Sequence, residues 1–238
     1  MVVRYIGHAS VLVELDGVRF LTDPLLRKRV AHLRRAVPLE TIDAVDAVLI
    51  SHGHYDHLDL PSLRKLAAKV VVPRGLGARL RGFDVVEVRE GDEVSVGSVA
   101  VKATHAEHDG GRPPWGQSSA LGYALTGSRR IFFAGDTGLF AEMDGLVPQL
   151  DVALVPIWGW GAELGRGNHL DPEQAAEAVR RLRPEIAVPI HWGTYRPFYR
   201  SSSAPFLSVP ADAFVRAAAK AAPDVDVRVL RPGEELEV

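Results

Sequence analysis

The chain of 238 residues contains no cysteine. This absence excludes disulfide frameworks, thiolate nucleophiles and cysteine-ligated zinc sites. Any metal site must therefore be built from histidine, aspartate and glutamate side chains. A chain of this length can nevertheless bury a sizeable core without disulfide bonds.

Long apolar runs and a strong excess of one charge are absent as well. No segment approaches the ~18 apolar residues that a membrane-spanning helix needs. The formal net charge of -2 gives no overall field that would favour nucleic acid or an anionic membrane. The first residues lack the charged and apolar regions of a signal peptide. These features favour a cytoplasmic protein with a small-molecule substrate, and they predict neither nucleic acid nor a membrane as partner.

Strand and helix patterns alternate along the chain. Apolar periodicity and turn residues predict strands over residues 2–7, 10–15, 18–22, 45–50, 70–73, 85–88, 93–96, 99–104, 120–126, 130–134, 152–156, 186–190 and 225–230. Helices are predicted over residues 60–68, 76–80, 172–182 and 211–221. Hairpins and βα units occur in both halves. This order predicts an α/β fold with two sheets packed face to face and helices outside, a four-layer αββα sandwich in one domain over residues 1–238.

Histidine is concentrated between residues 51 and 59, which read SHGHYDHLD. Imidazoles this close together repel one another once protonated, and they are costly to bury without partners. A divalent metal ion reverses that cost, because neutral imidazole and carboxylate are good ligands. Residues that alternate along an extended turn could send His52 and His54 to one ion, and Asp56 and His57 to a second. The alternative is a solvated polar loop.

Several other predicted strands are followed by a histidine or an aspartate, namely His8, His105 with His108, Asp136 and His191. Loops at the same end of the strands converge in layered α/β proteins. Taken singly, Asp136 could be a turn residue and His191 a packed core histidine. The recurrence of the same placement favours one shared site.

The segment HGHYDH over residues 52–57 matches the H-x-H-x-D-H signature of the metallo-β-lactamase superfamily. The resemblance covers nearly the whole chain. Residues 6–10 (IGHAS), 21–24 (LTDP), 133–138 (FAGDTG), 169–175 (HLDPEQA) and 189–193 (PIHWG) are similar to one branch of it. That branch includes L-ascorbate-6-phosphate lactonase and N-acyl-phosphatidylethanolamine phospholipase D.

This resemblance implies the metallo-β-lactamase fold and two adjacent divalent metal ions. Zinc is the first expectation, while manganese and iron stay open. The implied ligands are His52, His54 and a later histidine for one ion, Asp56, His57 and His191 for the other, and Asp136 as a bridge. Alignment favours His108 as the later histidine. His105 is the alternative, and it would otherwise lie near the substrate.

Two such cations would lower the pKa of a bound water toward 7, and the resulting hydroxide would attack a carbonyl carbon or a phosphorus. The resemblance therefore implies a metal-dependent hydrolase that cleaves a lactone, ester or phosphodiester of a small anionic substrate. Asp56 would carry the proton in this reaction. Two alternatives stay open: a nuclease that uses the basic stretch 27–35, and a non-catalytic metal-binding protein. Lactonase relatives also make a homo-oligomer possible.

Further residues are candidates for supporting roles. His169 precedes a helix start, where an anion is favoured, and is a catalytic and substrate-binding candidate. Arg112 and Trp192 are substrate-binding candidates, while His8 and Asp23 would orient metal ligands. Each has a simpler alternative, such as a packed ring at a helix entry or a locally bonded polar group. The basic stretch 27–35 is typical of a solvated face, although it could bind phosphates.

Overall fold

The strands form two seven-stranded sheets and a three-stranded one in the computed structural model, which describes residues 1–39, 41–111, 118–158, 169–201, 203 and 205–238. The first sheet runs β17 (Glu235–Glu237), β1 (Val2–Gly7), β2 (Ser10–Leu15), β3 (Val18–Thr22), β6 (Ala47–Leu49), β7 (Lys69–Pro73) and β8 (Asp84–Val88). The second runs β16 (Asp226–Val227), β14 (Ile186–Ile190), β13 (Val152–Pro156), β12 (Arg130–Phe133), β11 (Ser119–Thr126), β10 (Val99–Asp109) and β9 (Glu93–Val96).

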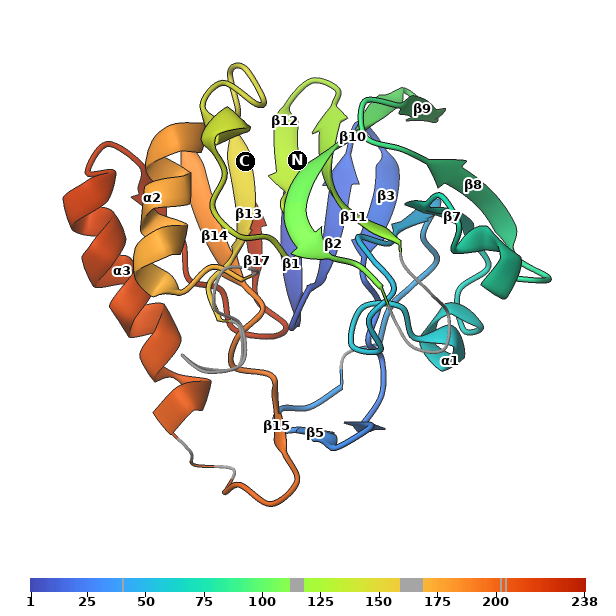
Figure 1. Cartoon of the computed structure of the whole chain (residues 1–238), viewed down its shortest axis with the longest axis horizontal. Coiled ribbons are helices and arrows are strands. Elements are labelled where there is room, and N and C mark those ends of the chain that lie inside the picture. The colour runs from blue at the N-terminus through green and yellow to red at the C-terminus, as the bar shows by residue number, and fades with distance from the viewer. Residues whose placement is uncertain (40, 112–117, 159–168, 202, 204) are drawn as a thin grey trace.

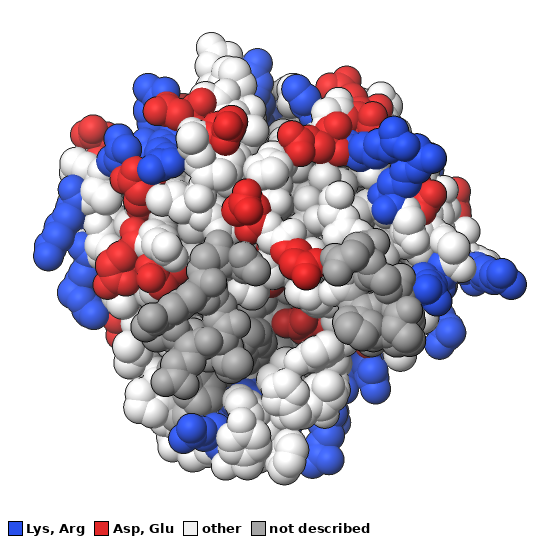
Figure 2. All heavy atoms as spheres, viewed as in Figure 1, with Lys and Arg blue, Asp and Glu red and all other residues white. Residues whose placement is uncertain are grey.

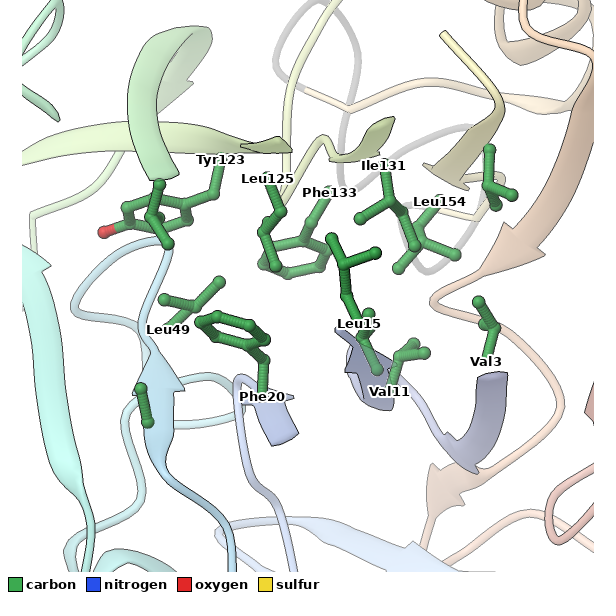
Figure 3. Packing of buried hydrophobic residues seen from close by; sticks show 14 of the residues in the cluster. Val3, Val11, Leu15, Phe20, Leu49, Tyr123, Leu125, Ile131, Phe133 and Leu154 are labelled. Atoms are coloured by element: carbon green, nitrogen blue, oxygen red, sulfur yellow. The ribbon is translucent and has the colours of Figure 1, made fainter. Parts of the chain in front are cut away.

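The two large sheets face each other, and the side chains between them form the main core (Figure 3). Side chains alternate between the two faces of a strand, so every second residue points into this layer. Val11 and Phe20 from the first sheet meet Tyr123 and Phe133 from the second, and all four are buried. The central strand β13 is buried along its whole length, which explains its continuous apolar sequence.

Helices cover the outer faces of both sheets (Figure 1). Helices α2 (Pro172–Leu182) and α3 (Val209–Ala221) lie against the second sheet and bury residues such as Val179 and Phe214. Helix α2 begins at Asp171, whose side chain accepts a hydrogen bond from the backbone of Gln174 in a capping box. Helix α1 (Leu60–Leu63) and its flanking loops cover the first sheet. The predicted four-layer αββα sandwich is confirmed.

The predicted helix over residues 60–68 is too long. Arg64 N still donates to Leu60 O, but Lys65 N and Leu66 N donate to residues only three positions back. The last turn therefore tightens and the helix ends at Leu63, which lets the chain reach β7 within a few residues. The short helix predicted over 76–80 is the 3₁₀ turn η1 (Gly77–Arg79), and two more such turns are η2 (Ala141–Met143) and η3 (Pro205–Leu207).

The predicted final strand over residues 225–230 is also too long. Only β16 pairs with β14, and after Arg228 the chain leaves the second sheet. It crosses to the first sheet, where Gly233 N donates to Tyr5 O at 2.7 Å and β17 pairs with β1. The C-terminal segment thus closes one edge of both sheets.

The three-stranded sheet, which the sequence pattern did not predict, lies below the large sheets in Figure 1. It consists of β4 (Arg29–Val30), β5 (Leu33–Arg35) and β15 (Tyr195–Pro197). Its inner face carries Val30, Leu33 and Tyr195, which form a small core with Leu25.

The basic stretch 27–35 is only in part the solvated face that was expected. Arg35 is 7% exposed and donates from Nη2 to Ile6 O at 2.5 Å and from Nε to Pro38 O at 3.2 Å. Arg27 pairs with Asp59 at 3.1 Å. Arg35 therefore supports the strand that leads to His8, and Arg27 supports the start of α1. Both cations are engaged within the chain and are not free to bind an extended polyanion.

Candidate metal centre

The loops that carry the candidate ligands meet at one end of the sheets, and backbone hydrogen bonds join them. Gly53 N in the histidine loop donates to Gly110 O at 3.1 Å, and Gly138 N after Asp136 donates to Glu107 O at 2.8 Å. His191 N donates to His8 O at 2.8 Å. The main chain therefore fixes the loops relative to one another, independently of what the side chains bind.

Three histidines form one half of the cluster. His52 Nε2 lies 2.8 Å from His54 Nδ1, and His108 Nε2 lies 3.2 Å from the same His54 nitrogen. One nitrogen from each of the three rings lies within 4.8 Å of the others. The structure thus places His108, and not His105, beside the first two histidines of the motif.

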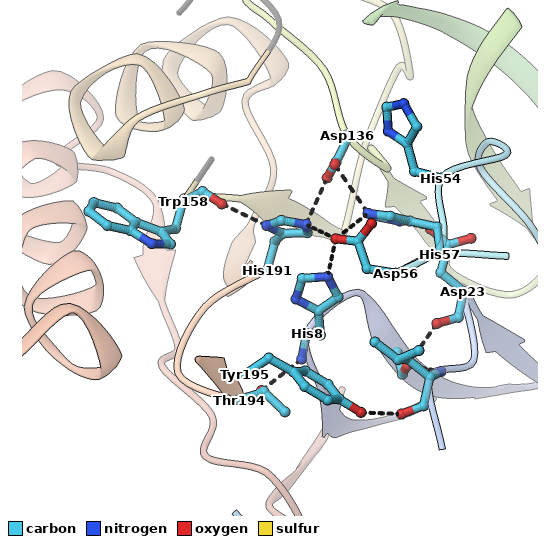
Figure 4. Close-up of polar contacts among 12 residues, drawn as sticks. His8, Asp23, His54, Asp56, His57, Asp136, Trp158, His191, Thr194 and Tyr195 are labelled. Carbon is cyan, nitrogen blue, oxygen red and sulfur yellow. Dashed lines mark hydrogen bonds and ion pairs between the residues drawn. The ribbon is translucent and has the colours of Figure 1, made fainter. Parts of the chain in front are cut away.

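Two histidines and two aspartates form the other half (Figure 4). Asp136 Oδ2 lies 3.1 Å from His57 Nε2, and Asp136 Oδ1 lies 3.3 Å from His191 Nε2. Asp56 Oδ2 lies 3.9 Å from each of these two imidazole nitrogens. Asp136 also comes within 4.0 Å of His52 Nε2, so its carboxylate stands between the two halves.

In His52, His57 and His191 the opposite ring nitrogen, Nδ1, is held by an acceptor. His57 Nδ1 donates to Asp23 Oδ2 at 2.7 Å, and His191 Nδ1 donates to Trp158 O at 2.6 Å. His52 Nδ1 lies 2.9 Å from Ser51 Oγ, which itself donates to Asp23 Oδ2 at 2.5 Å. With the proton fixed on Nδ1, a neutral ring presents the lone pair of Nε2 to the cluster.

This arrangement fits a metal ion. The neutral His191 ring and the Asp136 carboxylate face one another as acceptors, and buried Asp136 Oδ1 makes no hydrogen bond within the described ranges. A cation resolves the conflict, since a tetrahedral site with Zn–N distances of about 2.0–2.1 Å separates neighbouring ligand atoms by ~3.3 Å. The observed contacts of 2.8–3.3 Å are close to that spacing. The cluster can therefore bind metal.

His8 and His191 have left-handed backbone conformations, with φ of 59° and 62°. Such values are rare outside glycine and persist where surrounding contacts enforce them, commonly at functional sites. His8 N donates to Thr194 Oγ1 at 2.8 Å, and its ring Nε2 lies 3.1 Å from Asp56 Oδ2. His8 thus positions Asp56 through its side chain and His191 through its carbonyl group.

Gly135 allows the Asp136 loop to approach the histidine loop. It has φ of 63°, and a Cβ atom there would lie 2.7 Å from Ser51 Cβ. Both facts require glycine at this position.

A bulge in β10 brings His108 to the cluster. The pairing of β10 with β11 shifts between His105 and Asp109, where β10 has more residues than its partner. Bulges reorient side chains and are frequent beside active sites. Glu107 N donates to Thr137 Oγ1 at 2.9 Å, so the bulged segment is bonded to the Asp136 loop.

Electrostatics keep both aspartates charged. Burial alone would raise the pKa of Asp136, but His191, His57 and His169 hold it well below its usual range. Asp56 behaves in the same way, because His57 and His8 outweigh the effect of burial on its pKa. The metal-free cluster thus offers two carboxylates that remain ionised at neutral pH.

His191 should stay neutral across the physiological range in the metal-free protein. Burial lowers its pKa to about 3, although Asp136 acts in the opposite direction. In a ¹H–¹³C titration we expect no inflection of the His191 ring signals between about pH 5 and 8. The surface residue His105 is an internal control. Burial lowers its pKa, but hydrogen bonds to Glu90 and Glu107 together raise it overall, so its signals should titrate above the ordinary value of about 6.5.

The difference in His191 pKa between the native and unfolded states makes the stability of the metal-free protein depend on pH. Unfolded His191 binds a proton below about pH 6.5 and the native residue does not. The contribution of His191 to stability is complete above that pH, and it is lost as the pH falls toward the native value of about 3. An inflection of His191 near pH 6.5 in the folded protein would contradict the burial seen here.

The remaining candidates lie in different surroundings. His169 Nε2 is 3.2 Å from Asp136 Oδ2, and its ring centroid is 4.7 Å from that of His108. His105 instead contacts Glu90 and Glu107 in a separate hollow of about 520 Å³. Arg112 lies outside the described residues, as do Trp115 and Trp160.

Trp192, a substrate-binding candidate, makes packing contacts in the structure. Its indole N–H donates to Pro189 O at 2.9 Å, and its ring packs against the core beneath α2 and α3. The ring also stacks on Tyr5 at 6.4 Å. These contacts give Trp192 a packing role, and its part in substrate binding stays a prediction.

Sequence reasoning missed several supporting residues. Ser51 and the carbonyl group of Trp158 anchor histidines, and Thr194 anchors the backbone of His8. Ser51 directly precedes the histidine motif and could have been noticed for that reason. A carbonyl acceptor and a partner 186 residues away leave no local signal.

Comparison with known proteins agrees with this geometry. Residues 18–192 match the family described as the beta-lactamase superfamily domain. The chain is 31% identical over 249 residues to a UPF0173 metal-dependent hydrolase of Methanopyrus kandleri, with 100% of both chains covered. It is 31% identical over 225 residues to N-acyl-phosphatidylethanolamine-hydrolyzing phospholipase D 1 of Caenorhabditis elegans, covering 80% of this chain and 63% of that protein.

Structural similarity extends over the whole chain. A novel metallo hydrolase, Igni18, from Ignicoccus hospitalis superposes with a TM-score of 0.74 at 27% identity, covering 99% of this chain and 97% of that one. By contrast, the chain spans only 59% of the length of an uncharacterized protein of Mycobacterium tuberculosis with which it shares 34% identity.

The fold is similar to that of proteins described as metal-dependent hydrolases, and the cluster of histidines and aspartates can hold a metal ion. The chain belongs to the metallo-β-lactamase superfamily. Within the described ranges, no helix is both long and apolar enough to span a bilayer.

Proposed function

We propose that the chain binds two divalent ions, zinc first among them, and hydrolyses a lactone, ester or phosphodiester of a small anionic substrate. The main support is the way three histidines are held. The Nδ1 atoms of His52, His57 and His191 are bonded to acceptors, so their Nε2 atoms face Asp136. Nitrogen and oxygen ligands without sulfur suit zinc, and also manganese or iron.

The two halves of the cluster support a division of ligands. His52, His54 and His108 would hold one ion, Asp56, His57 and His191 would hold the other, and the Asp136 carboxylate would serve both. When bound, such ions make water nucleophilic near neutral pH and polarise the group that is attacked. The ligand side chains would keep this chemistry at the meeting point of the loops.

Asp56 and His169 lie where proton transfer and substrate binding are needed. Asp56 stays ionised and receives a hydrogen bond from His8, so it can hold a proton that leaves the attacking water. Burial lowers the pKa of His169, but its bond to Asp136 raises it overall. A His169 ring with cationic character can contact an anionic group of the substrate or donate to the departing oxygen.

Replacing His169 with alanine should lower turnover by about 10²-fold or more, because general acids and charge-stabilising donors contribute that much. Metal content, measured by elemental analysis, should stay unchanged. Unchanged kinetics would contradict the role. Loss of metal together with activity would instead show that His169 is a metal ligand, since it lies next to Asp136.

A substrate panel on protein of known metal content tests the proposed function. It should include bis(p-nitrophenyl) phosphate, a simple lactone and a carboxylic ester, each with zinc-loaded and chelator-treated protein. Metal-dependent hydrolysis of at least one compound is expected. Metal-loaded protein that leaves all of them intact would favour a non-catalytic metal-binding protein. The buried Arg35 and paired Arg27 weaken the nuclease alternative.

A further inference from the structure

The outer face of the three-stranded sheet carries a row of arginines. Arg34 on β5 is paired in register with Arg29 on β4 and with Arg196 on β15, so the three residues share one face. The buried Val30, Leu33 and Tyr195 occupy the opposite face, which leaves Arg29 and Arg34 exposed. Arg196 is half-buried and donates to the carbonyl groups of Pro197 and Phe198 in its own loop. Like charges directly opposite each other in a sheet are destabilising.

Carboxylates do not relieve this repulsion within the described part of the chain, where none of the three arginines forms an ion pair. Residues 27–39 and 193–210 contain no aspartate or glutamate. On the face drawn in Figure 2, the region low in the view shows cationic and uncharged residues and no acidic ones. A local positive field therefore exists in a chain whose net charge is -2.

Two exposed aromatic rings continue this surface. Phe198 and Tyr199 directly follow β15 and are 63% and 68% exposed, more than any other large hydrophobic residue described. Phe198 N donates to His32 O at 3.0 Å, so the segment stays tied to the small sheet. Arg200 places its guanidinium group 6.0 Å from the Tyr199 ring. Exposed rings flanked by cations are typical of surfaces that insert into a charged interface.

We propose that this aromatic–basic surface, made of Arg29, Arg34, Arg196, Phe198, Tyr199 and Arg200, docks the protein on an anionic phospholipid bilayer. The cations match the charge of the headgroups, and the rings match the boundary between headgroups and acyl chains. The surface projects from the small sheet at the lower end of the molecule in Figure 1. Single-stranded nucleic acid is bound in grooves, which a projecting surface does not provide.

The small sheet also connects this surface to the metal centre. Tyr195 on β15 lies 5.7 Å from the His8 ring, measured between centroids, and Tyr55 of the histidine loop packs against the inner core of the sheet. A docked protein would therefore hold its metal centre close to the bilayer. Membrane docking goes beyond the proposed hydrolysis and differs from the sequence-based expectation of no membrane partner. The sequence did not indicate this surface, because its arginines come together only when β5 and β15 pair in the folded chain.

Vesicle sedimentation with the full metal-loaded chain tests the proposal. Vesicles of phosphatidylcholine with 30% phosphatidylglycerol, a composition of roughly physiological surface charge, should bind the protein, and pure phosphatidylcholine vesicles should not. The double variant Arg29→Gln, Arg34→Gln should partition onto these vesicles about 25-fold more weakly than the parent, because each lost cation lowers the partition coefficient about fivefold. Phe198→Ser with Tyr199→Ser should also weaken binding.

Matched controls separate docking from general charge. The variant Arg74→Gln, Arg81→Gln makes the same charge change at other exposed positions, and Val215→Ser removes another exposed apolar side chain. Both should bind as the parent does. All variants should keep the thermal midpoint and metal content of the parent. These readouts do not require turnover, so failure of docking is distinguishable from failure of the proposed hydrolysis.

Four results would overturn the proposal. They are absence of sedimentation, equal binding to neutral vesicles, equal loss in the control variants, and binding of an oligodeoxythymidine with the vesicles left unbound. A dimer seen by sedimentation velocity that the aromatic double variant abolishes, without vesicle binding, would assign the surface to a second copy of the chain.

Discussion

Replacing Asp136 with asparagine is expected to lower hydrolysis by about 10³-fold, which corresponds to roughly 4 kcal/mol of transition-state stabilisation. The carboxylate stands between the two halves of the cluster and contacts His57, His191 and His169. Asparagine keeps the shape but removes the charge that both halves share. We expect elemental analysis to show less than half of the parent metal content after dialysis.

Asp144→Asn is the matched control for this experiment. Asp144 is exposed and pairs with Arg183 on the surface, so the same chemical change should leave activity and metal content intact. An Asp136→Asn protein with parental metal content and turnover would show that the carboxylate does not bind the ions.

Replacing Asp23 with alanine is expected to cost about 3–5 kcal/mol of unfolding free energy in the metal-free protein, because it leaves buried partners of a charged group unsatisfied. Asp23 is fully buried, accepts from Ser51 N at 2.7 Å and Ser51 Oγ at 2.5 Å, and orients His57 at 2.7 Å. Zinc affinity should fall about 10–100-fold, since a residue that orients a ligand is lost.

Urea denaturation and a chelator competition assay measure these two effects. Asp92→Ala is the control, because the Asp92 carboxylate also accepts a backbone N–H, that of Arg89, but at an exposed position. The Asp92→Ala variant should lose ~1 kcal/mol of unfolding free energy or less, because water replaces the lost acceptor. If both variants lose the same small amount of unfolding free energy, the hydrogen bonds of buried Asp23 do not support the site.

The strands that end at the site could be predicted because their signals are local. The bounds predicted for residues 2–7, 10–15 and 18–22 agree with β1, β2 and β3. Alternating apolar residues and the turn at Asp16 and Gly17 define them without reference to the rest of the chain. Helix α2 was predictable for the same reason, since its N-cap and its first proline lie within two residues.

The small sheet could not be predicted because its pairing joins residues about 160 positions apart. Arg35 pairs with Tyr195 across β5 and β15, and neither strand is long enough to show a period. The role of Arg35 was hidden as well, because it reads as one more surface cation until its bond to the carbonyl group of Ile6 is known. Short edge strands of two or three residues carry too few side chains for any pattern.

The cluster itself was predictable in composition but not in all its contacts. The histidine motif and the strand-end positions of Asp136 and His191 pointed to one site, and the structure brings these residues together. Alignment favoured His108 over His105, and the bulge that brings His108 to the cluster is visible only in the structure. The contact of His169 with Asp136 was also unforeseen, because its loop position gave no direction to the side chain.

The most direct test of the paired-metal centre is anomalous diffraction at the zinc edge from crystals grown with excess zinc. Two peaks are expected, one within about 2.0–2.2 Å of ligand atoms from His52, His54 and His108, and the other at similar distance from Asp56, His57 and His191. Asp136 should contact both. A single peak, no peak, or peaks bound elsewhere on the chain would contradict the assignment of these residues to two cooperating ions.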